Sequence, residues 1–326
     1  MKRDISAPKT LRGAILFFAD YDNCRKAVEA IHWPDGVVHC PRCGSEKVTY
    51  LANVRRWKCY SDHPRAQFSL KVGTIFEDSP VGFEKWLPAL WLLTNCKNGI
   101  SSYELARALG VTQKTAWFML SRLRLALQRS DGGKLSGNVE VDETHISGEA
   151  RNMHASKRKR LNVKRGRSMA GKVAVMGLLQ RHGKDAEDVS RIKLVMLDGL
   201  RRSKVQSKVR EHVEPGAILN TDAFSSYVGL HADYTHNVID HAECYVDGTV
   251  HTNNCENFWS LLKRAIKGTY VSVEPFHLFR YLDEQAFRFN NRADSDASRF
   301  ALALKGVIGK RLTYIALTGS ELPQTC

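Results

Sequence analysis

The chain has 326 residues and a formal net charge of +15, and 43% of its residues are hydrophobic. This composition indicates a globular protein of two or three domains, and no stretch approaches the roughly 18 apolar residues that a membrane-spanning helix requires. The excess of Lys and Arg predicts a polyanionic partner, most often nucleic acid, with an anionic membrane surface as the alternative.

The N-terminus carries basic residues followed by only six apolar ones, Ala14 to Ala19. That run is shorter than the roughly 7–15 apolar residues of a signal-peptide core. We therefore expect a cytoplasmic protein with no membrane partner. In that compartment its eight cysteines are expected to be thiols or metal ligands rather than disulfides.

Four residues have the spacing of a structural zinc site. Cys40 and Cys43 form the knuckle CPRCG, and fifteen residues separate Cys43 from Cys59, which is followed by His63. Such a set can close a tetrahedron around Zn²⁺ and stabilise a small segment with little core. His63 is the weaker ligand, because a three-residue gap is less usual than two. The alternative is a group of ordinary thiols.

The next elements are helical. Ser79 and Pro80 predict a helix start with Ser79 as N-cap, and Pro88 should kink or interrupt that helix. Further on, a short helix over 102–109 and a longer one opening at Thr112 predict a helix-turn-helix. The start of its second helix would meet DNA through Gln113, Lys114 and Thr115. The alternative is an ordinary helical hairpin.

A polar, glycine-rich stretch at 129–137 marks a domain boundary, after which apolar residues alternate as they do in strands. A basic loop at 151–167 contains eight Lys and Arg and no acid, and it could clamp DNA or be a solvated linker. The predicted strands lie at 138–146, 172–179, 191–197 and 217–224, with a helix at 203–213 between the last two.

Three acids are the catalytic candidates. Alternation on the strand places Glu140, Asp142 and Thr144 on one face and the valines on the other. Asp222 ends a second apolar strand, and Glu256 heads a helix. Carboxylates of this kind suit two Mg²⁺ or Mn²⁺ ions about 4 Å apart, which can act on a phosphodiester.

Each acid also has a structural alternative. Asp142 could be a strand-end hydrogen-bonding residue, and Asp222 could cap a turn. Glu256 could reach back to an N-cap at Asn253, as in a capping box. Against this, a single helical stripe carries Glu256, Ser260, Lys263 and Lys267, which suits a metal ligand followed by lysines that contact DNA phosphates.

The chain resembles the insertion-sequence DDE transposases of the ISXO-like, or Merlin-like, group along nearly its whole length. The matching motifs are WPDGV and CPRCGS (33–37, 40–45), GTIFEDS (73–79) with Phe68, KTAWFML (114–120), VEVDET (139–144), TDAFSSY (221–227), HTNNCENFWSLLKR (251–264) and YLDEQAFRFNNR (281–292). Several long motifs in the right order make the resemblance specific.

The resemblance implies an α/β (α+β) fold with an RNase H-like catalytic domain and a central mixed sheet. It implies the triad Asp142, Asp222 and Glu256, with Lys263 on a phosphate and Asn253 as the alternative third ligand. The expected domains are an N-terminal helix and zinc ribbon (1–78), a helix-turn-helix domain (79–130), the catalytic domain (137–300) and a C-terminal tail (301–326).

The expected function is that of a transposase that binds the inverted repeats of its element, cleaves them and joins the 3′-OH ends to target DNA. Its partner would be double-stranded DNA, and pairing of the two ends requires a homodimer or a larger assembly. The alternatives are a zinc-ribbon DNA-binding regulator without catalysis and an RNase H-like nuclease that does not join strands.

Overall fold

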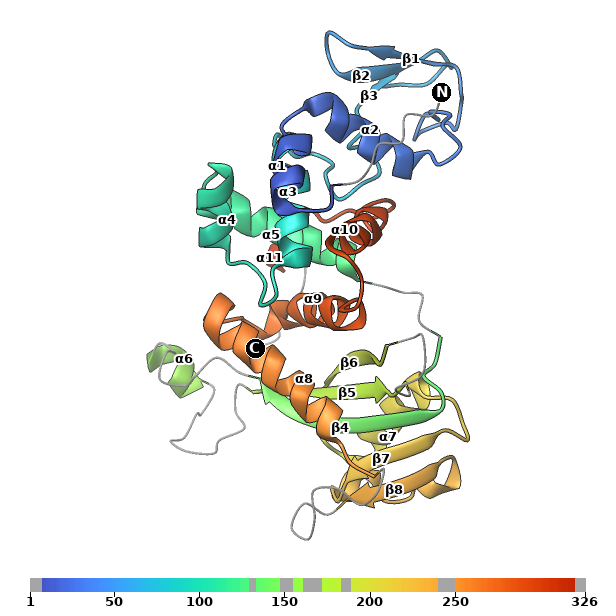
Figure 1. Ribbon diagram of the computed structural model, residues 1–326, viewed down its shortest axis with the longest axis vertical. Helices are drawn as coiled ribbons and strands as arrows, with labels where there is room; N and C mark the ends of the chain where they lie inside the picture. Colours follow the sequence, from blue (N-terminus) through green and yellow to red (C-terminus); the bar gives the residue numbers. More distant parts are fainter. Residues whose placement is uncertain are drawn as a thin grey trace. The chain divides into compact units, whose positions relative to one another are not determined.

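The computed structural model describes residues 8–128, 133–146, 155–160, 172–182, 189–239 and 250–319. The predicted basic loop at 151–167 lies outside these residues, except for the short helix α6 (Ala155–Arg160). The chain divides into two compact units (Figure 1). One unit joins Met1–Gln128 with Asp294–Cys326, and the other comprises Arg129–Ala293.

The first unit contains a small antiparallel sheet of β1 (Val48–Leu51), β2 (Arg56–Cys59) and β3 (Gln67–Phe68), in that order. Trp57 is buried at its centre, stacked on Phe68 and edge-on to Trp33, which ends the preceding helix. These aromatic contacts are worth about 0.5–1.5 kcal/mol each beyond the area that they bury.

Helices complete the first unit: α1 (Leu11–Phe18), α2 (Tyr21–His32), α3 (Phe83–Asn95), α4 (Ser102–Leu109), α5 (Gln113–Leu127), α10 (Asp296–Lys305) and α11 (Tyr314–Thr318). The predicted N-cap at Ser79 is wrong, because α3 is capped by Gly82. Lys71 Nζ instead binds the carbonyls of Ser79 and Val81 and holds this segment outside the helix. Pro88 lies within α3, which continues past it.

The helical pair α4–α5 follows the predicted bounds closely. Ser101 caps α4 through a capping box with Glu104. Gly110 ends α4 in the left-handed region at φ 59°, which glycine adopts without a steric penalty. Thr112 then caps α5 by accepting a hydrogen bond from the Thr115 amide.

Helix α10, near the C-terminal end of the chain, belongs to the first unit. The sequence had predicted a catalytic domain that extends to residue 300 and a tail at 301–326. Its Phe300 is buried and its ring packs against Phe18 and Trp91. Arg299 also donates to the side chain of Asn95 at the end of α3. Because Phe300 completes the core between α1 and α3, α10 is part of the first unit.

The second unit is built on a five-stranded sheet in the order β6-β5-β4-β7-β8. The strands are β4 (Asn138–Ile146), β5 (Val173–Gln180), β6 (Arg191–Leu197), β7 (Ile218–Asp222) and β8 (Thr235–Ile239). β4, β5 and β6 are antiparallel, whereas β7 runs parallel to β4 and β8. Only β8 was not predicted.

Helices cover both faces of this sheet. One face packs against α7 (Arg202–His212) through a core that includes Val139, Val141, Val205 and Val209. On the other face lie α8 (Asn253–Arg264) and α9 (Leu278–Asn290) (Figure 1), with Trp259 and Leu282 in a second core. The predicted α/β fold class, a mixed sheet of the RNase H-like kind preceded by a cysteine-rich ribbon and helices, is confirmed. No helix among the described residues is long and apolar enough to cross a membrane.

Candidate active site and zinc site

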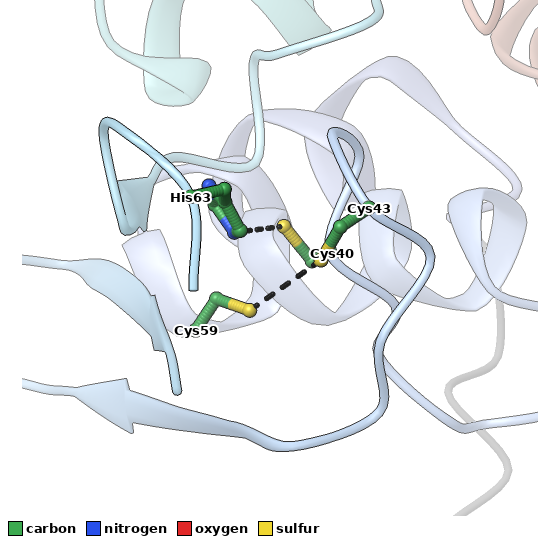
Figure 2. A group of neighbouring side chains, drawn as sticks. All are labelled: Cys40, Cys43, Cys59 and His63. Atoms are coloured by element: carbon green, nitrogen blue, oxygen red, sulfur yellow. Dashed lines mark hydrogen bonds between the residues drawn. The ribbon is translucent and has the colours of Figure 1, made fainter. Parts of the chain in front are cut away.

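The four predicted zinc ligands lie together in the first unit (Figure 2). One ligand atom from each of Cys40, Cys43, Cys59 and His63 lies within 4.8 Å of all the others. The Sγ atoms of Cys43 and Cys59 are 3.7 Å apart, and Cys40 Sγ is 3.5 Å from His63 Nε2. Thiolates bound to a tetrahedral Zn²⁺ at about 2.3 Å lie roughly 3.8 Å apart, so the set fits zinc.

The surroundings favour zinc ligation by His63 and Cys59. His63 Nδ1 lies 2.9 Å from the Pro64 carbonyl and donates to it, so Nε2 faces the thiols and can bind a metal once it has lost its proton. Burial opposes ionisation of Cys59, but hydrogen bonds from the Ser61 amide and His63 outweigh it and lower the Cys59 pKa to about 6. A thiolate is the form that binds metal.

Asp142 and Asp222 lie on neighbouring parallel strands of the second unit. The pairing of β4 with β7 aligns Val141 with Thr221, so the next residue on each strand is one of the two acids. Both acids point to the face of the sheet that α8 covers, because the alternate residues Val141 and Leu219 belong to the core on the α7 side. Asp142 lies mid-strand on β4, whereas Asp222 ends β7.

Asp142 is held by α8 and by its own strand. Its Oδ2 accepts a hydrogen bond from Trp259 Nε1 at 2.8 Å, and its Oδ1 accepts from the Glu143 amide at 2.8 Å. Burial raises the pKa of Asp142 to about 6, and the carboxylates of Asp222 and Glu256 also raise it, against the effect of Trp259. Asp222 and Glu256 are therefore each close enough to Asp142 to repel its charge.

Glu256 is exposed in the first turn of α8. The capping-box alternative is wrong, because the N-cap is Thr252 rather than Asn253 and the Thr252 side chain makes no capping hydrogen bond. Asn253 is also exposed, three residues earlier at the first position of α8. Asn253 and Glu256 both lie in the first turn of α8, so their positions on the helix do not show which of them would be the third metal ligand.

The three acids do not meet at one point. Among the described residues, the zinc ligands are the single group of three or more Cys, His, Asp or Glu whose ligand atoms all lie within 4.8 Å of one another. Asp142, Asp222 and Glu256 do not form such a group.

Glu143 is a fourth acid at this site, on the opposite face of β4 from Asp142. Burial raises its pKa to about 7, and Asp222 and Asp142 contribute in the same direction, against the effect of the Tyr227 hydroxyl. The sequence analysis did not assign it a role. Because Glu143 lies near two candidate ligands, its carboxylate adds to the negative charge that a bound cation would offset.

Glu140 was not predicted to have a function, although alternation had placed it on the Asp142 face. It is fully buried, and its carboxylate forms an ion pair with Arg181. Its oxygens also accept from the amides of Asn254 and Cys255, each at 3.0 Å. Glu140 thus binds the first turn of α8 to the strand that carries Asp142.

The predicted stripe on α8 is exposed along its length. Ser260, Lys263 and Lys267 all face solvent, as Glu256 does. Lys263 lies close enough to β4 to lower the pKa of His145, together with burial and Lys172. After Arg264 the helix widens into a π-helical segment at Ala265–Tyr270, which contains Lys267.

The three predicted DNA contacts on α5 differ in their surroundings. Lys114 is exposed, whereas Gln113 donates to Ser102 Oγ at 2.8 Å and Thr115 Oγ1 lies 2.8 Å from Thr112 Oγ1. The Gln113 side chain therefore joins α5 to α4, and the Thr115 side chain joins α5 to its own N-cap. Lys114 is the one of the three whose described surroundings leave it directed to solvent.

Comparisons with known proteins agree with this architecture. A family model described as an ISXO2-like transposase domain matches residues 134–290, which span the whole sheet and the candidate acids, and a transposase zinc-ribbon domain matches residues 20–61. The chain belongs to the ISXO2-like transposase family. His63 lies just beyond the ribbon match, so the cluster geometry is what includes it.

Two relatives extend the match to this family. An uncharacterized protein in the transposable element ISH50 of Halobacterium salinarum is 29% identical over 243 residues, which cover 72% of this chain and 79% of the relative. An uncharacterized transposase-like protein of Haemophilus influenzae is 28% identical over 102 residues, 31% of this chain and 82% of the relative.

The zinc site gives a first prediction. We expect Cys43→Ser to remove bound zinc and to unfold the ribbon, because a small sheet with few core residues depends on the metal. The measurement is zinc content per chain, with the fluorescence of Trp33 and Trp57 as a report of folding. Cys24→Ala removes a buried thiol outside the cluster and should retain zinc. Equal zinc content in the two variants would contradict the assignment.

Gly177 gives a second prediction. A Cβ there would lie 2.7 and 2.9 Å from two carbons of the Trp259 ring, so Gly177→Ala must displace the indole that binds Asp142. We expect the free energy of unfolding to fall by about 1–3 kcal/mol in urea titrations. Gly268→Ala has no neighbour within 4 Å and should change it by less than about 0.5 kcal/mol. Similar losses in both would refute the close packing of Trp259 on β5.

The raised pKa of Asp142 gives a third prediction, for protein free of Mg²⁺ and Mn²⁺. Its pKa of about 6 in the folded chain exceeds the ordinary 3.8, so the folded state holds this proton more tightly than the unfolded state does. The free energy of unfolding therefore falls as pH rises from about 4 through 6, and the whole penalty is present at pH 8.

Asp142→Asn removes that penalty. We expect it to raise the free energy of unfolding by about 1–3 kcal/mol at pH 8 and by roughly half as much at pH 5. The measurement is urea unfolding of variant and wild type at both pH values. Any effect of pH on the zinc site is common to both proteins and cancels. A gain that is the same at both pH values would show that Asp142 is not buried among like charges.

Proposed function

We propose that this chain is a DNA transposase that cleaves the ends of its element and joins their 3′-OH groups to target DNA. The observation that carries the proposal is the position of Asp142 beside Asp222 on neighbouring parallel strands, with Glu256 at the head of the helix that covers this face. Burial raises the pKa of Asp142 to about 6, and the carboxylates of Asp222 and Glu256 contribute to the rise, so a bound cation would relieve this repulsion.

Divalent cations fit these acids. Hard carboxylate oxygens are the ligands that Mg²⁺ and Mn²⁺ prefer, and a buried carboxylate that is repelled by two neighbouring carboxylates gains from binding a cation at neutral pH. When bound, two such ions would activate a water or a 3′-OH and stabilise the leaving oxygen of a phosphodiester. Asp142, Asp222 and Glu256 would hold them, with Asn253 as the alternative third ligand.

The chain's own residues would orient the DNA around that centre. Trp259 keeps the Asp142 carboxylate turned toward α8 through its 2.8 Å hydrogen bond. Lys263 and Lys267 lie exposed further along the same helix, where they would contact phosphates on either side of the cleaved bond. Such contacts fix position and add affinity that depends on salt.

Recognition of the element ends is assigned to the first unit. The pair α4–α5 has the tight turn and exposed second-helix start of a DNA-binding helix-turn-helix, with Lys114 as its outward-facing cation. Gln113 and Thr115 would contact bases only if they exchanged their local hydrogen bonds for DNA. We expect two or more chains on paired DNA ends, because joining requires both ends together.

A nuclease of the same fold that does not join strands is the second candidate function. It would use the same acids, so cutting alone does not distinguish it. A strand-transfer assay with pre-cleaved ends and Mn²⁺ separates the two, since only a transposase forms a joined product. A DNA-binding regulator without catalysis would give neither product.

The proposed chemistry gives a fourth prediction. We expect Asp142→Asn, Asp222→Asn and Glu256→Gln each to reduce cleavage of labelled element ends in Mn²⁺ at least ~10³-fold, because each removes a charged oxygen from the metal centre. Binding of the uncut ends should be retained. The element ends can be identified from inverted repeats that flank the gene.

Asn253→Ala is the matched control for the third position, since it changes an exposed residue on the same helical turn as Glu256. Cleavage should survive in this variant. Loss of cleavage in Asn253→Ala with retention in Glu256→Gln would exchange their roles, and retained cleavage in Asp142→Asn would overturn the proposed function.

A further inference from the structure

We infer that Glu140 is a positioning residue for the candidate active site: it binds the first turn of α8 to β4 and thereby sets where Glu256 and Trp259 lie relative to Asp142. The inference rests on the proposed function for its consequence in catalysis. Its structural content stands on contacts within the second unit.

The head of α8 lacks a cap of its own. The first backbone amides of a helix have no partner within the helix, and a Ser, Thr, Asp or Asn side chain at the N-cap usually accepts from them. Thr252 occupies the N-cap of α8, but its side chain makes no capping hydrogen bond. The amides of Asn254 and Cys255 instead donate to Glu140 Oε2, a group 114 and 115 residues away in the sequence.

The same carboxylate receives further donors from both sides of the helix start. Asn254 Nδ2 donates to Glu140 Oε1 at 2.6 Å, and Arg181 Nε donates to the same oxygen. Arg181 Nη2 in turn donates to the carbonyl and to Nδ1 of His251, at the segment that enters α8. Burial and Arg181 lower the pKa of His251, which agrees with a neutral ring whose Nδ1 accepts this bond.

This arrangement sets a distance between the catalytic candidates. Glu140 and Asp142 are two residues apart on one face of β4, about 7 Å along the strand. Cys255, held by Glu140, directly precedes Glu256, and Trp259 lies one turn further on and binds Asp142. Strand and helix are therefore joined at two points, and Glu256 lies between them on the helix. A shift of α8 by 1 Å would move a metal ligand out of place, which is costly in catalysis.

A structural ion pair is the simpler alternative. Buried pairs contribute little net stability, since removing two charges from water offsets their attraction. Loss of one partner is nevertheless destabilising, so a fall in stability after substitution would not separate the two roles. A useful test must report geometry at Asp142 independently of folding and of activity.

The test compares Glu140→Gln with Glu284→Gln in the full chain. Glu284 is the matched control because it is also fully buried in the second unit and paired with an arginine, Arg288. The first readout is the Trp259 indole N–H resonance in zinc-containing, ¹⁵N-labelled protein free of Mg²⁺ and Mn²⁺, assigned by Trp259→Phe. Asp142→Ala supplies its position when the bond to Asp142 is absent.

We expect Glu140→Gln to move this resonance toward its position in Asp142→Ala, and Glu284→Gln to leave it in place. The second readout is the Kd for Mn²⁺, measured by calorimetry, together with the Mn²⁺ concentration that half-saturates cleavage. Both values should rise about tenfold or more in Glu140→Gln, because Mn²⁺ binds more weakly, and neither should rise in this way in Glu284→Gln. Binding of uncut DNA should be unchanged. If Glu140→Gln does not fold, Asn254→Ala removes one donor, keeps the buried charge and should give a smaller change in the same direction.

The inference would be wrong if the indole resonance did not move and Mn²⁺ binding did not change in folded Glu140→Gln or in Asn254→Ala. Glu140 would then have a structural role only. The proposed function can fail separately. If Asp142→Asn still cleaved DNA, the triad assignment would fall, whereas the indole readout in protein free of Mg²⁺ and Mn²⁺ would still decide whether Glu140 positions α8.

Discussion

The second unit depends on the parallel pairing of β4 with β7. That pairing aligns Val141 with Thr221, and so places Asp142 beside Asp222 on the face that α8 covers. This pairing brings like charges together where they are partly buried, which is unfavourable, and burial and repulsion raise the pKa values of Asp142 and Glu143. The valines on the opposite face of β4 pack against α7 and keep the strand in register despite this repulsion.

The head of α8 is the second element of the site, and it reaches the sheet through polar contacts in an otherwise apolar interface. Phe258 and Leu262 anchor the helix in the core over β5 and α9, which leaves its orientation about its own axis to be set by directional bonds. Glu140 and the Trp259–Asp142 hydrogen bond supply these bonds. Gly177 on β5 leaves the space that the Trp259 ring needs, since any side chain there would meet it.

The ribbon of the first unit lacks the large hydrophobic sheet of the second unit. Its three strands are two to four residues long and bury few side chains, so a zinc ion held by Cys40, Cys43, Cys59 and His63 would replace much of the missing core. The helices behind it are large and apolar, and they include Phe300 from the C-terminal end of the chain. That long-range contact explains why a helix expected near the catalytic domain's end belongs elsewhere.

The sequence by itself determined the features that local patterns encode. Alternation gave β4 within its observed bounds, turn chemistry at Gly110 gave α4 and α5, and cysteine spacing gave the metal ligands, because each depends on neighbours in the chain. Tertiary structure decided what distant residues do to one another. It placed α10 with the N-terminal helices and gave α8 a cap from Glu140 instead of Asn253. Contacts between residues more than a hundred positions apart leave no periodic signal in a single sequence, so packing alone settles them.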